Sequence, residues 1–190
     1  MGVKTRIMLL CESKKITWEI LAYIAQKFVP KEKKYDIHKK VAYYPYWFLT
    51  RKRAKKNSDN IEGLQIGGVV SITDKTYLKD HVSFNGMIIQ GNGAVKIGRY
   101  FHSGEDCRII TQNHNYDGGK TIPYDETVIC KDVEIGDFVW IGTNVMILPG
   151  TKIGEGAIIQ GGSVVHGEIP RCAIAGGNPC KVFKYRDIEH

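Results

Sequence analysis

The chain has 190 residues, of which 43% are hydrophobic and 25% are charged, a composition that fits one compact domain plus an extension and excludes a second full domain. Its net charge of +7 is uneven, because residues 1–60 hold 15 Lys and Arg against 5 Asp and Glu, whereas residues 61–190 hold 12 against 15. A basic head on a mildly acidic body predicts an anionic partner for the head alone, and we expect no nucleic-acid partner.

The cysteines and the N-terminus indicate the cellular compartment. The five cysteines lie apart from one another, without CxxC spacing or clustered histidines, which excludes a disulfide framework and a zinc site. The first residues are charged and contain no long apolar stretch, so the sequence predicts neither a signal peptide nor a membrane anchor. We therefore expect a cytoplasmic protein that needs no metal.

The basic head contains two recognisable segments. Residues 12–29 carry apolar side chains at helical spacing and end before Pro30, which predicts an amphipathic helix. Residues 43–57 combine aromatic side chains with a run of Lys and Arg. Three interpretations of the head remain open: it contacts an anionic membrane surface at the inner face, it holds an acceptor linked to a lipid or nucleotide diphosphate, or it covers the end of the following domain. We favour the cover, because the first structural repeat needs its apolar end protected.

A repeat of six residues dominates the rest of the chain. Aliphatic residues recur at strict intervals of six, each two residues after a position that is mostly small or β-branched: Ile129, Ile135, Ile141, Ile147, Ile153, Ile159 and Val165. This period matches neither an α-helix, at about 3.6 residues, nor the alternation of a strand, at about 2. It predicts short strands joined by turns and coiled into a narrow prism, with one large aliphatic side chain per face pointing inward.

The same register is present upstream, with one irregularity. It begins at Ile66, Ile72, Leu78 and Phe84, slips by one residue, and resumes at Ile97, Ser103 and Ile109. Stacked repeats bury what one repeat cannot bury alone, so all these positions are expected in the core.

The repeat is interrupted between Ile109 and Ile129, where the separation is 20 residues, two more than three repeats. Glycines, Pro123 and polar residues predict a loop at about residues 111–127 that projects from the coil. The loop carries His114 five residues after the last core position, where the chain leaves the prism. Histidine is suited to proton transfer near neutral pH, although a lone loop histidine is more often simply solvated.

The stretches IGDFVWIGTNVMILPGTKIGEGAIIQGGSVV and AGGNPCKVFKYR resemble the hexapeptide-repeat acetyltransferases, and the resemblance covers about residues 64–186. It is closest to sugar and polysaccharide O-acetyltransferases of the maltose, galactoside and colanic-acid type. The resemblance implies a mainly β fold, a left-handed parallel β-helix, here with an α-helical N-terminal extension. We expect the extension to span residues 1–60, the β-helix 61–186 and a tail 187–190.

The resemblance also implies acetyl-CoA as the donor substrate and direct transfer, with His114 as the general base that deprotonates the acceptor hydroxyl. Trp140 in VWIG matches the tryptophan that lines the acetyl end of the donor site. A backbone N–H at Gly142 or Thr143 is expected to bind the carbonyl oxygen of the thioester in the transition state.

Further along the donor, Gly161 and Ser163 match the face on which the family runs the pantetheine arm. Lys181 and Lys184 follow AGGNPC, where the family places basic residues near the CoA phosphates, as charge complementarity requires. For Gly161 and Ser163, a role as small residues at the corners of the prism is the alternative.

On the acceptor side, Asn85 falls where the family often has an asparagine, and Asn113 and Asp117 flank the expected base. The partner that orients His114 stays open among a backbone carbonyl and three carboxylates: Glu105, Asp106 and Asp117. The family further implies a homotrimer, with each site formed between neighbouring prisms.

The favoured function is O-acetylation of a saccharide hydroxyl in bacterial surface polysaccharide synthesis. The alternatives are an acetyltransferase for an amino sugar, serine or a xenobiotic, and a non-catalytic scaffold. A carbonic anhydrase on the same prism would need three metal-binding histidines, and only His102 and His114 have suitable positions.

Overall fold

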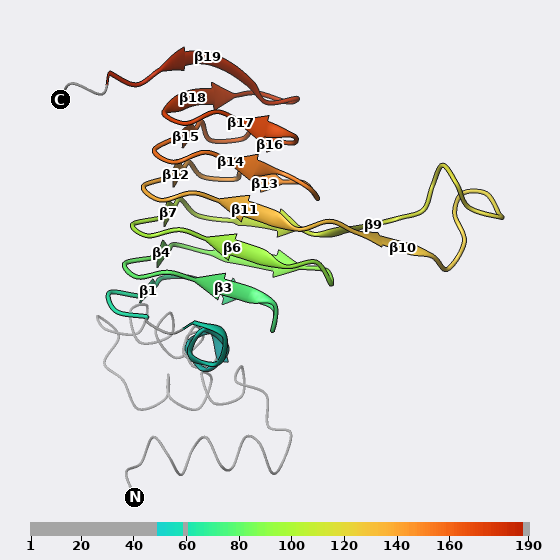
Figure 1. The fold of residues 1–190 in the computed structure, drawn as a ribbon, viewed down its shortest axis with the longest axis horizontal. Helices are drawn as coiled ribbons and strands as arrows, with labels where there is room; N and C mark the ends of the chain where they lie inside the picture. Colours follow the sequence, from blue (N-terminus) through green and yellow to red (C-terminus); the bar gives the residue numbers. More distant parts are fainter. Residues whose placement is uncertain (1–48, 59–60, 188–190) are drawn as a thin grey trace, which may run out of the picture. The chain divides into compact units, whose positions relative to one another are not determined.

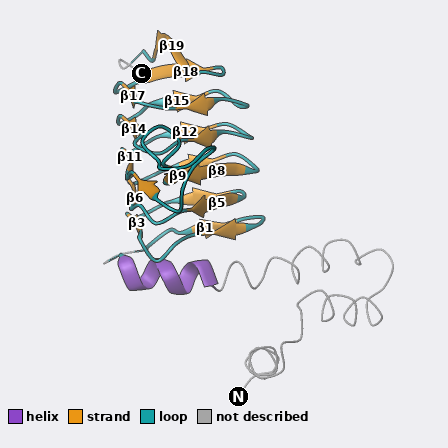
Figure 2. Cartoon of the chain, turned by 90° about the vertical axis from the view of Figure 1, so that its right-hand side faces the viewer, coloured by secondary structure: helices purple, strands orange, loops and turns teal. Residues whose placement is uncertain are grey.

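The computed structural model describes residues 49–58 and 61–187, which form a parallel β-helix preceded by a helix over residues 49–57 (Figure 1). Successive coils stack along one axis, and the order of the strands along the chain follows the order of the coils (Figure 2). The prediction of a mainly β, parallel β-helix is confirmed. The helix predicted over residues 12–29 lies outside the described residues.

Each coil has three faces, and strands of successive coils pair in parallel to form one sheet per face. Face 1 holds β1 (Gln65–Ile66), β4 (Ser83–Phe84), β7 (His102–Ser103), β12 (Trp140–Ile141), β15 (Ile158–Ile159), β18 (Ala173–Gly176) and the antiparallel β19 (Lys181–Tyr185). Face 2 holds β2 (Val70–Ser71), β5 (Met87–Gln90), β8 (Cys107–Ile110), β13 (Met146–Ile147) and β16 (Val164–Val165). Face 3 holds β3 (Thr76–Leu78), β6 (Val95–Ile97), β11 (Val133–Ile135), β14 (Lys152–Ile153) and β17 (Glu168–Ile169).

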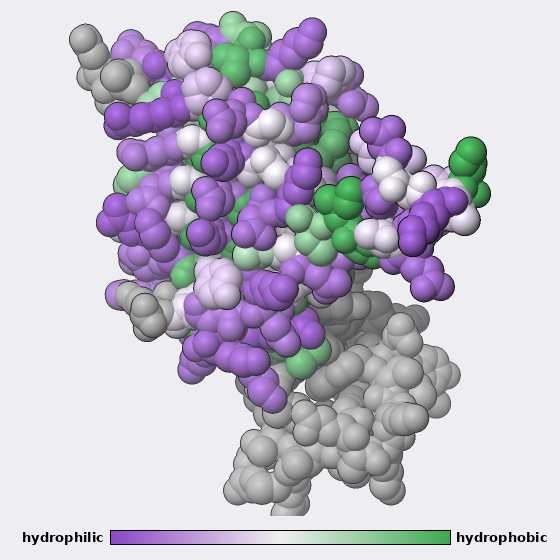
Figure 3. All heavy atoms as spheres, turned by 45° about the vertical axis from the view of Figure 1, so that its right-hand side comes forward, coloured by the Kyte–Doolittle hydropathy of each residue, from purple (hydrophilic) through white to green (hydrophobic). Residues whose placement is uncertain are grey.

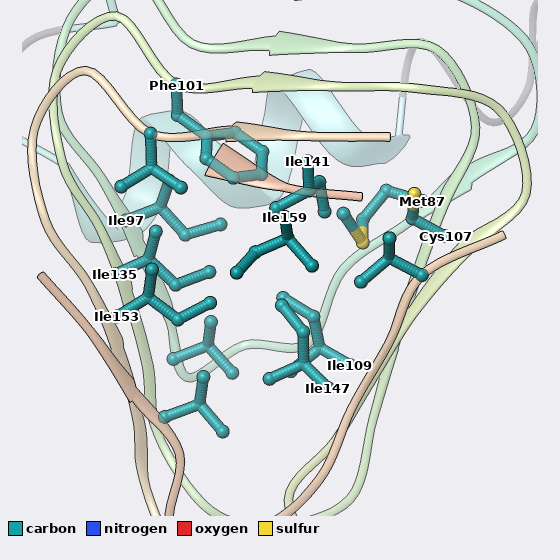
Figure 4. Close-up of a cluster of buried hydrophobic side chains, with 14 of the residues drawn as sticks. Met87, Ile97, Phe101, Cys107, Ile109, Ile135, Ile141, Ile147, Ile153 and Ile159 are labelled. Carbon is teal, nitrogen blue, oxygen red and sulfur yellow. The ribbon is translucent and has the colours of Figure 1, made fainter. Parts of the chain in front are cut away.

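The period of six places one aliphatic ladder inside each face. On face 3 the inward side chains are in register from coil to coil: Leu78, Ile97, Ile135, Ile153 and Ile169. Figure 4 shows this ladder on one wall, Phe101, Ile141 and Ile159 on a second, and Met87, Cys107, Ile109 and Ile147 on the third. All of these side chains are buried, so the interior is a continuous dry core.

The predicted core series is confirmed from Ile135 to Val165, and the prediction for Ile129 is wrong. Ile129 is 40% exposed, because it lies in a separate hairpin strand rather than in a coil. The one-residue slip upstream is the net result of two changes, because the second coil follows the first by 18 residues at β4, 17 at β5 and 19 at β6. Between β5 and β6 the chain turns through Gly91, whose φ of 103° is a left-handed conformation that glycine adopts without strain.

The helix over residues 49–57 covers the first coil. Its buried side includes Thr50 and Ala54, and the Thr50 hydroxyl donates to the Val70 carbonyl at 2.8 Å. Arg53 donates to the Ile72 carbonyl at 2.7 Å, and Asn57 donates to the Thr76 carbonyl at 3.3 Å. The helix thereby satisfies carbonyl groups at an edge beyond which the described residues form no further coil. Among the described residues, no helix has the length and apolar composition needed to cross a membrane.

Candidate functional site

An arm leaves the prism between β8 and β11. It is a two-stranded antiparallel hairpin of β9 (Gln112–His114) and β10 (Val128–Cys130), closed by residues 115–127 (Figure 1). His114 pairs with Val128 at the end of β9 and is exposed. The 20-residue separation between Ile109 and Ile129, two residues longer than three repeats, thus marks the change from coil to hairpin. The predicted base, His114, lies on this hairpin.

The closed end of the arm is held by its own polar groups. Asp125 accepts hydrogen bonds from the N–H of Lys120 at 3.0 Å and of Thr127 at 2.8 Å, and these bonds lower the pKa of its carboxyl group. The hydroxyl of Thr121 donates to the carbonyl of Tyr124 at 3.0 Å. Because these bonds are local, the loop has a defined conformation even though it projects from the core.

The imidazole of His114 stacks on the ring of Tyr124. The ring centroids are 3.7 Å apart and the planes are inclined by 14°. His114 also lines a hollow of about 320 Å³ on the arm, together with Asn113, Asp117 and Lys131. Tyr124 was not predicted from the sequence. The one feature that could have pointed to it is an aromatic side chain in an otherwise polar loop.

The carboxylates proposed to orient His114 do not bond to it. Glu105 and Asp106 lie at a turn of the coil before β8, outside the hollow, and Asp117 lines the hollow. In residues 49–58 and 61–187, no side-chain or backbone group makes a hydrogen bond to the imidazole of His114.

A second group of predicted residues lies on the outer surface of face 1. Trp140 is half-exposed, and it stands in one outward row with His102 in the coil before it and Ile158 in the coil after it. The row continues through Ile174 to Lys184 on β19. Three steps between strands, at about 4.7–4.9 Å each, carry it roughly 14 Å from Trp140 to Lys184. Lys181, on the same strand, is exposed as well.

Asn85 also lies on this side, directly after β4. Its amide Nδ2 donates to the Ser103 carbonyl at 3.1 Å and lies 3.4 Å from Nε2 of His102. The bond to Ser103 fixes the amide, so Asn85 presents a defined polar group two coils below Trp140 in the β-helix.

The turn between faces 1 and 2 exposes a backbone N–H. Gly142 donates its N–H to the Ile159 carbonyl at 2.8 Å, so this N–H is not available as the predicted donor to the thioester oxygen. The N–H of Asn144 is also used, because it donates to the Glu105 carbonyl at 2.9 Å. The buried thiol of Cys107 lies 3.1 Å from the Gly142 carbonyl and donates to it. Because a trans peptide holds C=O and N–H on opposite sides, the Thr143 N–H points outward. It meets no acceptor in the described part of the chain.

Gly161 and Ser163 differ in what they offer. Gly161 lies beside Thr143 in the next coil and is exposed. Ser163 is fully buried, where its hydroxyl donates to the Gln160 carbonyl at 2.6 Å and accepts the N–H of Gly177 at 3.1 Å. The side chain of Ser163 therefore closes a corner of the prism, and its place in the donor site stays a prediction.

Within one chain the two groups do not meet. The arm, with His114, Asn113 and Asp117, leaves the corner between faces 2 and 3, whereas Trp140 and Asn85 lie on face 1, which is the side opposite that corner. The core fills the space between them (Figure 4). The described residues contain no cluster of three or more His, Cys, Asp or Glu side chains that could hold a metal ion.

Comparisons with known proteins agree with this architecture. Residues 127–167 match the family described as Bacterial transferase hexapeptide (six repeats). A probable acetyltransferase of Mycobacterium tuberculosis is 35% identical over 136 residues, which are 66% of this chain and 45% of that protein. WbbJ of Escherichia coli K12, named for O-acetyl transfer in lipopolysaccharide biosynthesis, is 33% identical over 62% of this chain and 61% of its own length. The chain thus covers less than two thirds of the length of each of these relatives.

Two solved structures share the fold. A hexapeptide-repeat acetyltransferase of Vibrio cholerae, solved with acetyl-CoA, has a TM-score of 0.58 at 20% identity, covering 98% of this chain and 93% of that one. A galactoside acetyltransferase solved with coenzyme A has a TM-score of 0.54 at 20% identity, covering 97% and 91%.

Proposed function

We propose that this chain, which resembles the hexapeptide-repeat transferases, is an acetyl-CoA-dependent O-acetyltransferase that acts on a saccharide hydroxyl. The observation that carries the proposal is the position of His114. The repeat stops where a hairpin must begin, and the hairpin presents an imidazole in a hollow of about 320 Å³ with polar side chains beside it. That arrangement suits a general base that receives a proton from a hydroxyl.

The reaction needs one proton acceptor and one hydrogen-bond donor for developing negative charge. A ring nitrogen of His114 takes the proton of the acceptor hydroxyl, whose oxygen attacks the thioester carbonyl carbon. The outward N–H of Thr143 donates to the carbonyl oxygen as charge grows there, since Gly142 has used its own N–H in the ladder. The bond from carbon to sulfur then breaks, and the imidazolium returns the proton to the departing thiolate.

The outward row on face 1 fits the donor. Trp140 and the two isoleucines after it, Ile158 and Ile174, offer an apolar track for an extended pantetheine arm, and Lys184 and Lys181 offer cations at the end of the track for the phosphates. Gly142 and Gly161 have no side chain to block access from the turn.

Because His114 lies on the arm at the corner between faces 2 and 3, whereas Thr143 lies at the corner between faces 1 and 2, we infer that a complete site needs a second copy of the chain. We propose a homotrimer in which the arm of one copy meets face 1 of its neighbour, so that each interface holds one site. The outward side chains support this. Face 3 carries a ladder of charges, among them the pair of Lys96 and Glu134 at 3.2 Å, whereas face 1 carries the exposed Trp140.

The acceptor is proposed from the polarity of the site and from the relatives. Asn113 and Asp117 line the hollow beside His114, and Asn85 would be supplied by the neighbouring copy, so the acceptor meets amide and carboxylate groups suited to several hydroxyls. One relative is named for lipopolysaccharide biosynthesis, which supports an acceptor in surface polysaccharide synthesis.

The basic head is proposed to bring in an acceptor carried on a lipid or a nucleotide diphosphate, at the inner face of the membrane. In its described part, the helix over residues 49–57 leaves Lys52, Lys55 and Lys56 exposed on the side away from Thr50 and Ala54. Flotation with vesicles of anionic phospholipid should recover the full chain and lose a Lys52→Glu, Lys55→Glu, Lys56→Glu variant. Equal recovery of both proteins would remove these lysines from the proposal.

The experiment that tests the function measures CoA release from acetyl-CoA with maltose, methyl galactoside and nucleotide-linked sugars as acceptors. His114→Ala should lower turnover by ~10²–10⁴ while acetyl-CoA binding and thermal stability stay as in wild type. The matched control is His81→Asn, because His81 has a φ of 56° that asparagine tolerates. Acetyl-CoA binding without turnover of any acceptor would favour a non-catalytic scaffold. Normal turnover by His114→Ala would show that His114 is not the general base.

A further inference from the structure

The arm contains a ring that has no part in the chemistry described so far. Tyr124 lies ten residues after His114, and its ring covers one face of the imidazole, with centroids 3.7 Å apart and planes inclined by 14°. A separation this short between nearly parallel rings is full face contact, in which rotation of either ring about its bond to Cβ is blocked.

The backbone holds Tyr124 in this position. Its carbonyl accepts the hydroxyl of Thr121 at 3.0 Å, and the next residue, Asp125, accepts two backbone N–H groups. The N–H of Asn115 donates to the Thr127 carbonyl at 3.0 Å, which continues the hairpin pairing past His114. The loop therefore folds back on His114 from both of its ends, and the ring of Tyr124 is delivered to the imidazole by a hydrogen-bonded turn.

A general base works only if its lone pair points at the proton, and the orientation of an imidazole is usually fixed by a hydrogen bond to its second nitrogen. In the described part of the chain, His114 has no such bond. Stacking fixes the ring plane by a different means: Tyr124 closes one face of the imidazole, while His114 lines the hollow. The ring face of Tyr124 also attracts the positive charge that the imidazole gains as it takes the proton.

We propose that Tyr124 is a positioning residue for His114, which orients the base by ring stacking in place of a carboxylate or carbonyl partner. The inference rests on the proposed function of His114, and it adds the residue on which the rate of that function depends. Because the contact is made by the ring, the phenolic hydroxyl is dispensable.

The kinetic test compares Tyr124→Leu, which removes the ring, with Tyr124→Phe, which keeps it. With acetyl-CoA and the sugar that wild type turns over fastest, Tyr124→Leu should lower kcat on the order of 10²-fold, as expected for a misplaced catalytic group, with the KM for acetyl-CoA within about twofold of wild type. Tyr124→Phe should keep kcat within about threefold of wild type. The matched control is Tyr77→Leu, because Tyr77 is 45% exposed on the outer side of face 3, beside Lys96 in the next coil and away from the arm.

A second readout does not depend on turnover. In protein labelled at histidine, the ring signals of His114, assigned by their loss in His114→Gln, should be shifted upfield by the Tyr124 ring in wild type and in Tyr124→Phe. They should lose that shift in Tyr124→Leu. If no sugar is acetylated but the signals behave in this way, the proposed function fails and the stacking stands. Unchanged kcat or unchanged signals in Tyr124→Leu, or a Tyr124→Phe protein as slow as Tyr124→Leu, overturns the positioning role.

Discussion

The prism and the arm are held together by different forces. In the prism, aliphatic residues at intervals of six are buried in ladders, and Ile141 and Ile147 have no exposed surface. In the arm, Tyr116 is 76% exposed and Ile122 is 99% exposed, and polar groups such as Asp125 hold the loop. Figure 3 shows the outcome, with hydrophobic residues at the outer end of an arm that projects from a largely hydrophilic surface.

This difference separates stability from function. Stacking of coils stabilises the prism whether or not a ligand binds, whereas the arm contributes exposed apolar side chains and a histidine that have no role inside one chain. Exposed apolar side chains on a projecting arm are expected to be covered by another molecule. In our account that molecule is the neighbouring copy, and the arm is the part of each chain that completes the site of another.

The largest difference between prism and arm should appear in stability. Ile147→Ala removes a buried side chain from a ladder on face 2 and should cost about 2–5 kcal/mol. Ile129→Ala changes the same residue type at a position of the same six-residue series, but in the arm, and should cost no more than about 0.5 kcal/mol. Thermal and denaturant unfolding measure both. Equal losses would mean that the arm is part of the folded core.

The second prediction concerns a single backbone group. Thr143→Pro deletes the N–H proposed to bind the thioester oxygen and should lower kcat by ~10²–10³. The turn should survive, because proline already occupies the same turn position one repeat later. There Pro149 precedes Gly150, whose φ is 84°, just as Thr143 precedes Asn144, whose φ is 57°. Glu155→Pro is the matched control, since it deletes the N–H at the same turn position on another corner, before Gly156. Similar kinetics in the two variants would remove Thr143 from the mechanism.

The smallest effect is a pH dependence of the prism. Burial by itself raises the pKa of Asp137, but hydrogen bonds from the backbone and guanidinium of Arg99 and from Lys79 outweigh it, and the pKa is lowered. A lowered pKa stabilises the fold above the ordinary carboxyl value, about 3.9, and this contribution is lost as the pH falls through the lowered value.

Wild type should therefore melt higher than Asp137→Asn from pH 8 down to about pH 5, and the difference should shrink below about pH 4. Melting temperatures across this range measure it. A difference that grows as the pH falls would contradict the assignment.

The sequence predicts the prism far better than the arm, for a physical reason. A buried position such as Ile153 must be aliphatic, so its spacing is visible in the sequence, and the interruption of the spacing located His114. Ile129 shows the limit of this reasoning, because the series continues by one residue into a hairpin strand. Tyr124 was not predicted, since a contact between two loop residues leaves no period. The separation of His114 from Trp140 was equally invisible, because it depends on which face of the coil each residue reaches.

The most direct test of a site shared between copies uses two inactive proteins. His114→Ala damages the arm and Thr143→Pro damages the turn beside face 1, so each alone should be nearly inactive. If neighbouring copies complete each site, unfolding and refolding a one-to-one mixture should restore about a quarter of the wild-type turnover, the value for random mixing in a three-fold ring with one intact interface in each mixed trimer. Turnover that stays at the level of the separate variants would show that one chain holds the whole site, and would contradict the account.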